Sequence, residues 1–552
     1  MAKVTIDGRS IEVDAGTTVL RAAKQLGIEI PTFCYHPGLT IPANCRMCLV
    51  EVEKVPKPLP ACYTQVSEGM VVHTRSERTV DAQKAVLEFI LLNHPVDCPI
   101  CDQAGECVLQ EHFQTWSAKP SRLFHSKVAK EKAVHLGPRV VLDKERCIIC
   151  TRCVRFCEEV AKQPELTVED RGDHSEISTF PGRQLENPYS LNVVDICPVG
   201  ALTDSGFRFK RRVWFLDKRN SVCTGCSRLC SSRLDSTQNR AERMIPRYNP
   251  DVNQWWMCDD GRDMMRQRTR VVPPVARNGE TDSTVAAAVD ALAVWCAEAA
   301  ELGGEIGVAL SASLTNEDLY AWGKLVAAIG ARPYLVGRDP WQGDDLLRRD
   351  DRDCNGAGAA AILNAIVGPC GDAAALAGDA ASLHAVLLLD NEVGAAEALV
   401  GALAAHPRFA VLSDVDSPFS EAAEVVVPIS GLHHRDGTLV GFDGRVQRLL
   451  APLTALAGTM TPAEVAARIG AGLQVELAFA ADLAPESIFE RLAAEVEAFR
   501  NLNYTEIGDL GRPLTHGGDL APRRDQLDGT SGWEPDPVHP TAQRPFALRR
   551  GC

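Results

Sequence analysis

Several features are scarce or missing in this sequence of 552 residues, and each absence excludes a class of protein. An excess of basic residues is missing: the formal net charge is -15, so the basic patches of nucleic-acid-binding proteins are not expected. Long hydrophobic runs are missing too, since stretches such as 89–92 and 386–389 are far too short to cross a bilayer. The first residues lack the charged and then apolar segments of a signal peptide. We therefore expect a soluble protein whose membrane contacts come only through partners.

Residues arranged for acid–base or nucleophilic catalysis are also missing, so no catalytic residue is predicted. No G-x-G-x-x-G pattern follows a predicted strand, and we therefore predict no NAD or flavin site on this chain. The hydrophobic fraction of 45% is ordinary, so the chain can bury proper cores. Its length suggests roughly three or four domains.

Cysteine, in contrast, is abundant: the sequence has 20 cysteines, and most of them lie in four sets before residue 260. Each set has a C-x2-C core and four potential ligands, a pattern typical of thiolates that bind zinc or iron–sulfur clusters. Without an export signal, this spacing favours metal ligation in a reducing compartment over disulfides. The four sets are Cys34, Cys45, Cys48 and Cys62; His94, Cys98, Cys101 and Cys107; Cys147, Cys150, Cys153 and Cys197; and Cys223, Cys226, Cys230 and Cys258.

The first set has the spacing C-x10-C-x2-C-x13-C. Residues 3–14 alternate around Asp7-Gly8 and predict a hairpin, a helix is predicted from Leu20 to Leu26 with a threonine cap, and a strand follows the third cysteine. A hairpin, a helix and a cysteine-bearing loop are the parts of a plant-type ferredoxin domain, although the first gap differs from the plant-type spacing. A [2Fe–2S] cluster is favoured over a zinc ribbon, because ribbons use two C-x2-C knuckles and here two of the cysteines stand alone.

The second set follows a predicted helix over 76–93, which ends before Pro95 because the residue preceding a proline avoids the helical region. Its pattern is H-x3-C-x2-C-x5-C, in which His94 stands where a fourth ligand is needed. Spacing alone does not separate a [4Fe–4S] cluster from a zinc site with three cysteines and one histidine. The neighbouring sets favour the cluster.

The third set begins with C-x2-C-x2-C-x3-C, the bacterial-ferredoxin run, and ends with a remote cysteine that Pro198 follows. Five cysteines cannot hold two clusters of four ligands each. We therefore assign one [4Fe–4S] cluster to the set that includes Cys197, and expect Cys157 to be a free buried thiol. The fourth set, C-x2-C-x3-C with Cys258, follows a strand-like stretch at 207–217, and strands and turns are expected over 233–256.

The composition changes after Arg270. Residues 271–283 indicate a linker, and beyond it strands and helices alternate up to about residue 428 in a doubly wound α/β pattern. Within this pattern a helix is predicted between a cap at Thr315 and a stop at Gly330. From residue 501 the chain turns irregular and is rich in proline and glycine. The isolated cysteines of this half are expected to be structural; they are Cys296, Cys354 and Cys370.

In this order, the four sets resemble the large iron–sulfur subunit, of the G type, of the proton-pumping NADH:quinone oxidoreductase, respiratory complex I. The resemblance covers the first 270 residues densely, and all sixteen ligand positions are present. It implies a [2Fe–2S] cluster on the first set and [4Fe–4S] clusters on the other three, with His94 as a ligand and iron as the only metal. The fourth cluster occurs in some bacterial members of the family and is absent from many others.

The resemblance implies an α+β multi-domain fold with a molybdopterin-oxidoreductase-like second half. Residues 437–447 are similar to a segment of those enzymes, but Gly441 and Asp443 replace its Asn and Glu. In complex I this half is a relic without a cofactor, so no molybdopterin is expected. The predicted regions are a [2Fe–2S] ferredoxin-like domain at 1–77, a [4Fe–4S] domain with one histidine and three cysteine ligands at 78–117, a [4Fe–4S] ferredoxin-like domain at 138–212, a molybdopterin-oxidoreductase-type [4Fe–4S] domain at 216–272, a degenerate α/β domain at 284–500 and an irregular tail at 501–552.

The implied function is electron transfer within NADH dehydrogenase, a translocase, with no complete active site on this chain. Electrons pass singly from a flavin- and NADH-binding subunit to the first set, then to the third, then to the His94 set and on toward quinone, which the whole complex couples to proton translocation. The fourth set lies off this line. The implied partners are that flavin subunit and other peripheral-arm iron–sulfur subunits, on the cytoplasmic side of the inner (plasma) membrane. The alternative is the electron-transfer subunit of an NAD-linked hydrogenase or formate dehydrogenase.

Overall fold

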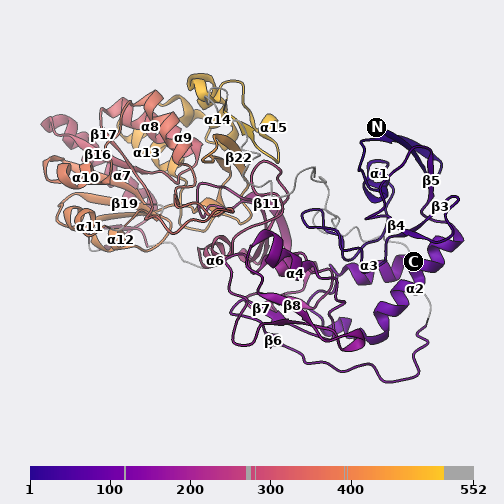
Figure 1. Cartoon of the computed structure of the whole chain (residues 1–552). Helices are drawn as coiled ribbons and strands as arrows, with labels where there is room; N and C mark the ends of the chain where they lie inside the picture. The colour runs from indigo at the N-terminus through magenta and orange to yellow at the C-terminus, as the bar shows by residue number, and fades with distance from the viewer. Residues whose placement is uncertain (117–119, 269–274, 280, 391, 395, 515–552) are drawn as a thin grey trace, which may run out of the picture. The chain divides into compact units, whose positions relative to one another are not determined.

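The computed structural model describes residues 1–116, 120–268, 275–279, 281–390, 392–394 and 396–514 (Figure 1). Two compact units divide the chain, one within Met1–Leu216 and one within Asp217–Ser531. Among the described residues, no helix is both long and apolar enough to cross a membrane.

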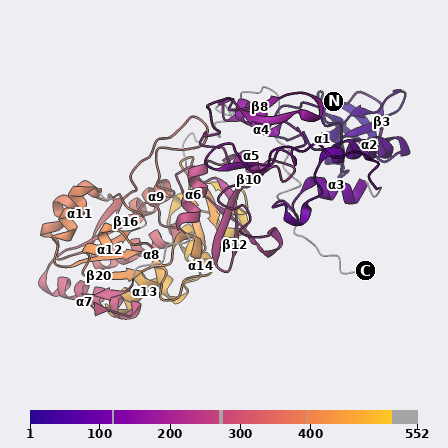
Figure 2. The same ribbon diagram turned by 90° about the horizontal axis from the view of Figure 1, so that it is seen from below.

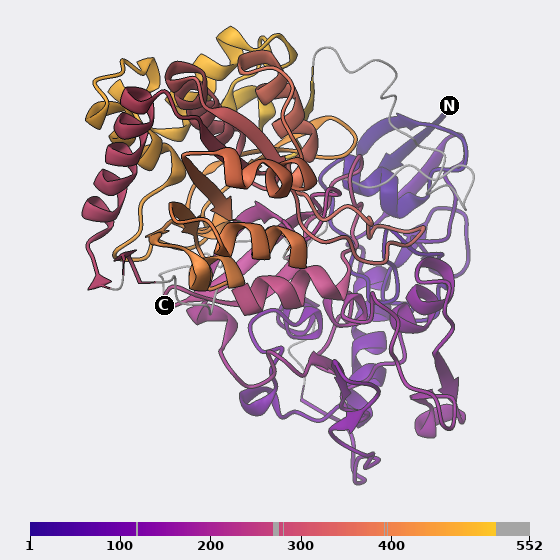
Figure 3. The ribbon, with the colours of Figure 1, turned by 90° about the vertical axis from the view of Figure 1, so that its left-hand side faces the viewer.

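The first unit begins with a five-stranded sheet of order β2-β1-β5-β3-β4 (Figure 3, indigo). The predicted hairpin is confirmed, and Asp7 and Gly8 at its turn both adopt the positive φ that a two-residue hairpin turn requires. The predicted helix is α1 (Val19–Gln25), whose first turn is capped by the hydroxyl of Thr18. The strands are β1 (Ala2–Ile6), β2 (Arg9–Val13), β3 (Leu49–Val52), β4 (Leu59–Pro60) and β5 (Met70–His73).

A long helix, α2 (Glu77–Asn93), follows this sheet and ends at His94 before the proline, as predicted. The last carbonyl groups of a helix lack partners within it. Here Nζ of Lys127 donates hydrogen bonds to the carbonyl oxygens of Leu91, Leu92 and His94, at 2.7, 3.0 and 2.8 Å. The lysine cation also lies at the negative end of the helix dipole, where a positive charge is stabilising. Its hydrogen bonds hold the backbone in place at His94, where the helix ends.

The rest of the first unit consists of short elements around the second and third cysteine sets. The strand predicted over 207–217 is wrong: the stretch forms a 3-10 turn at Val213–Phe215, and a strand begins only at Asp217. The reason is that Arg212 donates to the carbonyl oxygens of Cys101 and Pro99, which wraps the segment around the second set. The elements are α3 (Val108–Trp116), β6 (Val134–His135), β7 (Val140–Leu142), α4 (Arg152–Arg155), β8 (Leu166–Glu169), β9 (Glu176–Thr179), α5 (Asn192–Asp195) and β10 (Leu202–Asp204).

The second unit begins with a three-stranded antiparallel sheet, and the fourth cysteine set lies in the loop between its first two strands and directly before the helix that follows it. Its middle strand buries Asp235, whose carboxylate pairs with Arg233 at 2.7 Å and with Arg243 at 2.8 Å. Burial alone would raise the pKa of this carboxyl, but the two guanidinium groups hold it below its usual value. The elements are β11 (Asp217–Val222), β12 (Ser231–Thr237), β13 (Arg240–Pro246) and helix α6 (Asp259–Arg268).

A seven-stranded sheet of order β15-β14-β20-β19-β18-β16-β17 forms the centre of the second unit and confirms the predicted α/β alternation. The strands from β16 to β20 are parallel. The predicted helix between Thr315 and Gly330 is α8 (Asn316–Ile329), with the Thr315 hydroxyl accepting from the Asp318 amide and Gly330 at φ +67°. The parallel strands are β16 (Ile306–Ser311), β17 (Arg332–Val336), β18 (Ala385–Asp390), β19 (Phe409–Ser413) and β20 (Val425–Pro428).

Both faces of this sheet are covered, which explains why its strands are continuous apolar runs. Alternate residues of β16 enter different cores: Val308 and Leu310 pack with α7, α8 and α13, whereas Ala309 packs with α10, α11 and α12. In Figure 2, β16 and β20 lie between α11 on one side and α7 and α13 on the other. These and the remaining helices are α7 (Val285–Leu302), α9 (Gly356–Ile366), α10 (Ala373–Asp379), α11 (Glu397–Ala404), α12 (Pro418–Ala422), α13 (Pro462–Gly472) and α14 (Pro485–Glu495).

Two segments predicted to be irregular contain ordered elements. Within the predicted linker, β14 (Arg277–Asn278) and β15 (Thr281–Asp282) form a hairpin that extends the central sheet by pairing with β20. Within the predicted tail, α15 (Tyr504–Ile507) and β23 (Arg512–Pro513) pack on β22 (Arg445–Leu449), the partner of β21 (Gly437–Val440). Burial of Tyr504 and Ile507 explains this order, which no periodicity revealed. Residues 515–552 of the predicted tail lie outside the described residues.

The carboxyl group of Glu317 joins α8 to this C-terminal segment. Its oxygens accept hydrogen bonds from the amide and hydroxyl of Thr438, both at 2.8 Å, and from the Tyr504 hydroxyl at 3.0 Å. Burial raises the pKa of Glu317 from 4.5 to about 7. Between pH 4.5 and pH 7 the folded protein keeps the proton of Glu317, whereas the unfolded chain has lost it. The contribution of this group to the stability of the folded state is therefore full below pH 4.5 and is lost as the pH rises to 7.

We expect Glu317→Gln to stabilise α8 at pH 8 by about 3 kcal/mol, since each pKa unit corresponds to about 1.4 kcal/mol. At pH 4 the two proteins should be equally stable. Hydrogen exchange of the α8 amides between pH 4 and 8 measures this, with Glu497→Gln as an exposed control that should change nothing. An equal difference in stability at pH 4 and pH 8 would show that ionisation of the Glu317 carboxyl is not the cause.

Candidate cluster-binding sites

The first set lies on the loop between α1 and β3 and on the turn after β4. Its thiols pair two by two: Cys34 is hydrogen-bonded to Cys45, and Cys48 to Cys62. The hydrogen bond from Cys34 lowers the pKa of Cys45 to about 6, although burial opposes the shift. In a [2Fe–2S] cluster four thiolates serve two irons, two for each, so this pairing fits such a cluster.

The second set lines a cavity of about 980 Å³ beside α2 and α3, and all four of its residues reach this cavity. Burial lowers the pKa of His94 to about 4, so its imidazole is neutral near pH 7. Its Nδ1 atom is buried and has no hydrogen-bond partner among the described residues. A buried nitrogen without a partner is costly unless something binds it, and neutral imidazole nitrogen is a common metal ligand. His94 therefore fits the role of fourth ligand beside Cys98, Cys101 and Cys107.

The third set surrounds a cavity of about 20 Å³, which Cys147, Cys150, Cys153 and Cys197 line together. The other walls are mostly apolar and include Leu142, Ile148, Ile177 and Val199. Burial raises the pKa of the Cys197 thiol, while the amides of Val199, Ala201 and Leu202 donate to its sulfur and oppose the shift. Such amides stabilise a thiolate, the form in which cysteine binds metal.

Cys157 is fully buried but does not line this cavity. It follows α4 in a single π-helical turn, Phe156–Val160, and only burial and the charge of Glu165 raise the pKa of its thiol. The prediction that Cys157 is buried is confirmed. That Cys157 is not a cluster ligand stays a prediction.

The fourth set is buried, with three cysteines in the loop between β11 and β12 and Cys258 directly before α6. The amides of Gly225 and Gly261 each donate to a sulfur at 3.4 Å, that of Cys223 and that of Cys258 respectively. A methyl group at Gly261 would lie 2.8 Å from Sγ of Cys223 and 3.5 Å from Sγ of Cys258. Only glycine thus leaves room between these two sulfurs. Burial raises the pKa of every thiol in the set, so metal binding there would release protons.

No group of three or more His, Cys, Asp or Glu side chains is arranged around the position of a single metal ion in the described part of the chain. The second and third sets instead line cavities, and the first forms two pairs.

Three family models match the first unit. Residues 1–77 match the 2Fe-2S iron-sulfur cluster binding domain, residues 83–118 the NADH-ubiquinone oxidoreductase-G iron-sulfur binding region, and residues 137–203 the ferredoxin-like domain of NADH-quinone oxidoreductase subunit 3. The G subunit of NADH-quinone oxidoreductase from Streptomyces coelicolor is 41% identical over 329 residues, 59% of this chain and 39% of that protein. The G subunit of the Rickettsia conorii enzyme is 37% identical over 352 residues, 63% of this chain and 52% of that protein.

In its iron–sulfur part, this chain is similar to the G subunits of NADH-quinone oxidoreductases. It spans between 39% and 52% of the length of these two relatives. Among solved structures, a chain of an NAD+-reducing [NiFe]-hydrogenase in the H2-reduced state is 28% identical, with a TM-score of 0.35 over 38% of this chain and 91% of that chain. The family models show a [2Fe–2S] domain and [4Fe–4S] binding regions.

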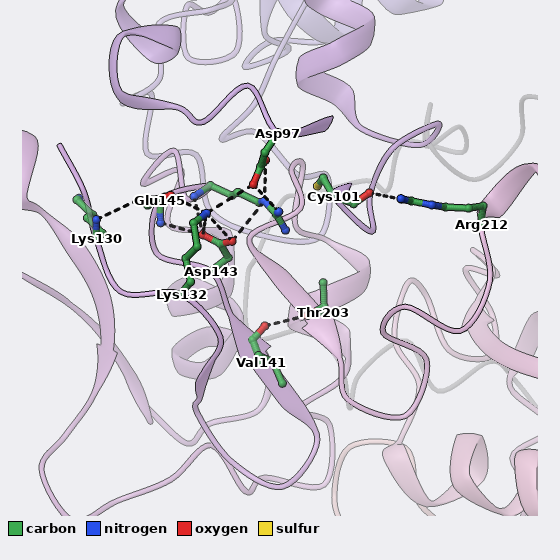
Figure 4. Close-up of polar contacts among 10 residues, drawn as sticks. Asp97, Cys101, Lys130, Lys132, Val141, Asp143, Glu145, Thr203 and Arg212 are labelled. Atoms are coloured by element: carbon green, nitrogen blue, oxygen red, sulfur yellow. Dashed lines mark hydrogen bonds and ion pairs between the residues drawn. The ribbon is translucent and has the colours of Figure 1, made fainter. Parts of the chain in front are cut away.

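Sequence patterns missed the charged side chains that join the second and third sets. Arg146, next to Cys147, donates to both oxygens of Asp97, next to Cys98, at 3.1 and 2.6 Å. Asp143 and Lys132 complete this network, and Figure 4 shows Asp97, Asp143 and Lys132 turned toward one another. Their only signal in the sequence is that Arg and Asp directly precede cysteines of two different sets.

A glycine makes a second junction between the same two sets. Gly200, three residues after Cys197, lies against the second set, and a methyl group there would come within 2.3 Å of Sγ of Cys101. Arg212 holds the other side of this loop through the Cys101 carbonyl oxygen (Figure 4). The loop of Cys101 is thus fixed by residues that lie about a hundred positions later in the chain.

Proposed function

We propose that this chain is the iron–sulfur electron-transfer subunit of an NADH:quinone oxidoreductase, with one [2Fe–2S] and three [4Fe–4S] clusters on the sixteen residues of the four sets. The observation that carries the proposal is that the first three sets adjoin within one unit. The Arg146–Asp97 pair joins the second and third sets. The side chain of Asn44, next to Cys45, donates to the carbonyl oxygen of Ile149 between two ligands of the third set, at 3.3 Å.

When bound, such clusters accept and pass on single electrons. The chain's own residues hold the sulfur ligands, surround them with apolar side chains and donate amide hydrogen bonds to them. Hydrogen bonds to sulfur and exclusion of water are the levers by which a protein sets a cluster's potential. With the third set adjoining both others, we propose the order first, third and second set for electron passage.

We further propose that the α/β half is a degenerate molybdopterin-oxidoreductase-like domain without a cofactor. In doubly wound sheets, ligands bind in the crevice beyond the carboxyl ends of the strands. Here Arg338, which follows β17, fills that position with a fully buried side chain. It donates to the Thr224 carbonyl oxygen at 2.7 Å and pairs with Glu392 after β18 at 3.5 Å. These contacts tie the sheet to the fourth cysteine set in place of a ligand.

The partners we propose are a flavin- and NADH-binding subunit and further iron–sulfur subunits of a peripheral arm at the cytoplasmic side of the membrane. The names of the relatives support this assembly. Large apolar side chains around the second set support it too: Phe89, Val96 and Ile100 are 73%, 77% and 65% exposed. If these side chains form one patch, it is of the kind that a partner protein covers, and we propose that a subunit receiving electrons from the second set docks there.

Rapid-freeze EPR on the native assembly tests this function. Mixing with NADH should reduce the clusters of the first, third and second sets within the turnover time, and quinone should reoxidise them. Hydrogen gas and formate should leave the clusters oxidised. These two substrates are the matched controls for a hydrogenase and a formate dehydrogenase as the parent enzyme. Reduction by hydrogen or formate in the absence of NADH would contradict the proposal.

A further inference from the structure

A buried arginine links the first and third cysteine sets directly. Arg155 lies at the end of α4, two residues after the ligand Cys153, and is 8% exposed. Its Nη2 atom donates to the carbonyl oxygen of Cys34 at 2.6 Å and to that of Cys150 at 3.4 Å. One nitrogen therefore contacts the backbone of a ligand residue from each set. Its Nη1 atom donates to the carbonyl oxygen of Thr40, in the loop of the first set.

The neighbouring Arg152 repeats this arrangement. Its Nη2 atom donates to the carbonyl oxygen of Tyr35, which follows Cys34, at 2.5 Å. Its Nη1 atom donates to the carbonyl oxygen of Ile196, which precedes Cys197, at 2.9 Å. Two guanidinium groups thus bond the backbone beside ligands of both sets, and the loop of the first set is held on helix α4.

Neither arginine forms an ion pair with a carboxylate of the described residues, although both are buried. Glu159 lies four residues after Arg155, and its carboxylate accepts from the amide and hydroxyl of Thr40 instead. A buried cation without a counter-charge is costly. Because Arg155 bonds the backbone of both Cys34 and Cys150, thiolate ligands at these two residues would supply the counter-charge.

We propose that Arg155, supported by Arg152, is a positioning residue that couples the [2Fe–2S] site to the third set. It supplies one positive charge that both anionic sites share, and its two hydrogen bonds fix the ligand Cys34 relative to the ligand Cys150. This inference rests on the proposed electron-transfer function and adds residues that the ligand patterns do not contain. The shared charge favours the reduced, more negative state at both sites.

Redox titrations followed by EPR on the purified holoprotein test the shared charge. In Arg155→Met, the midpoint potentials of the [2Fe–2S] signal and of the third-set signal should both shift to more negative values. The His94-set signal should keep its potential. Arg212→Met is the matched control, because Arg212 bonds the carbonyl oxygens of Cys101 and Pro99 and touches only the second set. Any shift in that variant should be confined to the His94-set signal.

Arg155→Lys separates charge from geometry and serves also if the methionine variant fails to retain its clusters. Lysine keeps the charge but cannot hold all the carbonyl groups, so both potentials should stay near those of the unmodified protein. Hydrogen-exchange protection of residues 34–45 should fall. Unchanged potentials in Arg155→Met, a shift at only one of the two sites, or full protection in Arg155→Lys would each overturn the inference. Absence of cluster signals from the unmodified protein would instead contradict the proposed function, so the two failures are distinguishable.

Discussion

Replacing Cys197 by alanine is expected to abolish the EPR signal of one [4Fe–4S] cluster and to stop electron flow through the chain. The sulfur of Cys197 lines the same cavity as Cys147, Cys150 and Cys153, and three amides donate to it. Its removal leaves three thiolates where a [4Fe–4S] cluster takes four. Because the third set adjoins both of the others, its loss interrupts the proposed route in the middle.

Cys157→Ala is the matched control for this experiment. Cys157 is fully buried but lies outside the cavity, so its loss removes only packing, roughly 1 kcal/mol for a small cavity. All cluster signals should persist in this variant. EPR spectra and iron content of the two purified proteins provide the comparison. If Cys157→Ala loses the signal and Cys197→Ala keeps it, the ligand assignment is reversed.

Replacing Arg146 by methionine should destabilise the junction of the second and third sets by about 3–5 kcal/mol, the usual cost of breaking a buried ion pair on one side. The side chains of Arg146 and Asp143 are each 5% exposed, and that of Asp97 is 22% exposed. Burial alone would raise the pKa of Asp97, but Arg146 and then Lys132 hold it below its usual value of 3.8. Without Arg146, charged carboxylates remain buried with too little compensation.

The pH dependence of this effect has a definite sign. A carboxyl with a lowered folded pKa contributes stability above its unfolded pKa and loses it as the pH falls through the folded value. The deficit of Arg146→Met should therefore be largest near pH 7 and shrink below pH 4. Hydrogen exchange of the residues around Asp97 and Asp143 measures it, and the double variant Arg146→Met, Asp97→Leu should recover much of the loss. A deficit that stays constant from pH 7 to pH 3 would contradict this account.

The sequence was sufficient for the parts of the fold that local chemistry determines. The hairpin at Asp7-Gly8 depends on a turn with positive φ, and α8 begins at the Thr315 cap and ends at Gly330. The grouping of Cys147, Cys150 and Cys153 with the remote Cys197 also followed from spacing, and all four line one cavity.

Contacts between distant segments were not predictable in this way. The strand predicted at 207–217 failed because Arg212 bonds to a loop more than a hundred residues earlier. The helix α15 is ordered by burial of Tyr504 and Ile507, not by a repeating pattern. The arginine links have the same origin, since nothing in the local sequence around Arg155 indicates which carbonyl groups it will bond.

The most direct test of the central claim is an iron, sulfide and zinc analysis of the chain purified without oxygen, together with its EPR spectrum. One two-iron and three four-iron clusters predict about fourteen irons and about fourteen acid-labile sulfides per chain. Zinc should be near zero, and a [2Fe–2S] signal should stand beside several [4Fe–4S] signals. Zinc in stoichiometric amounts with little iron would contradict the account. About ten irons would mean that one of the four sets binds no four-iron cluster.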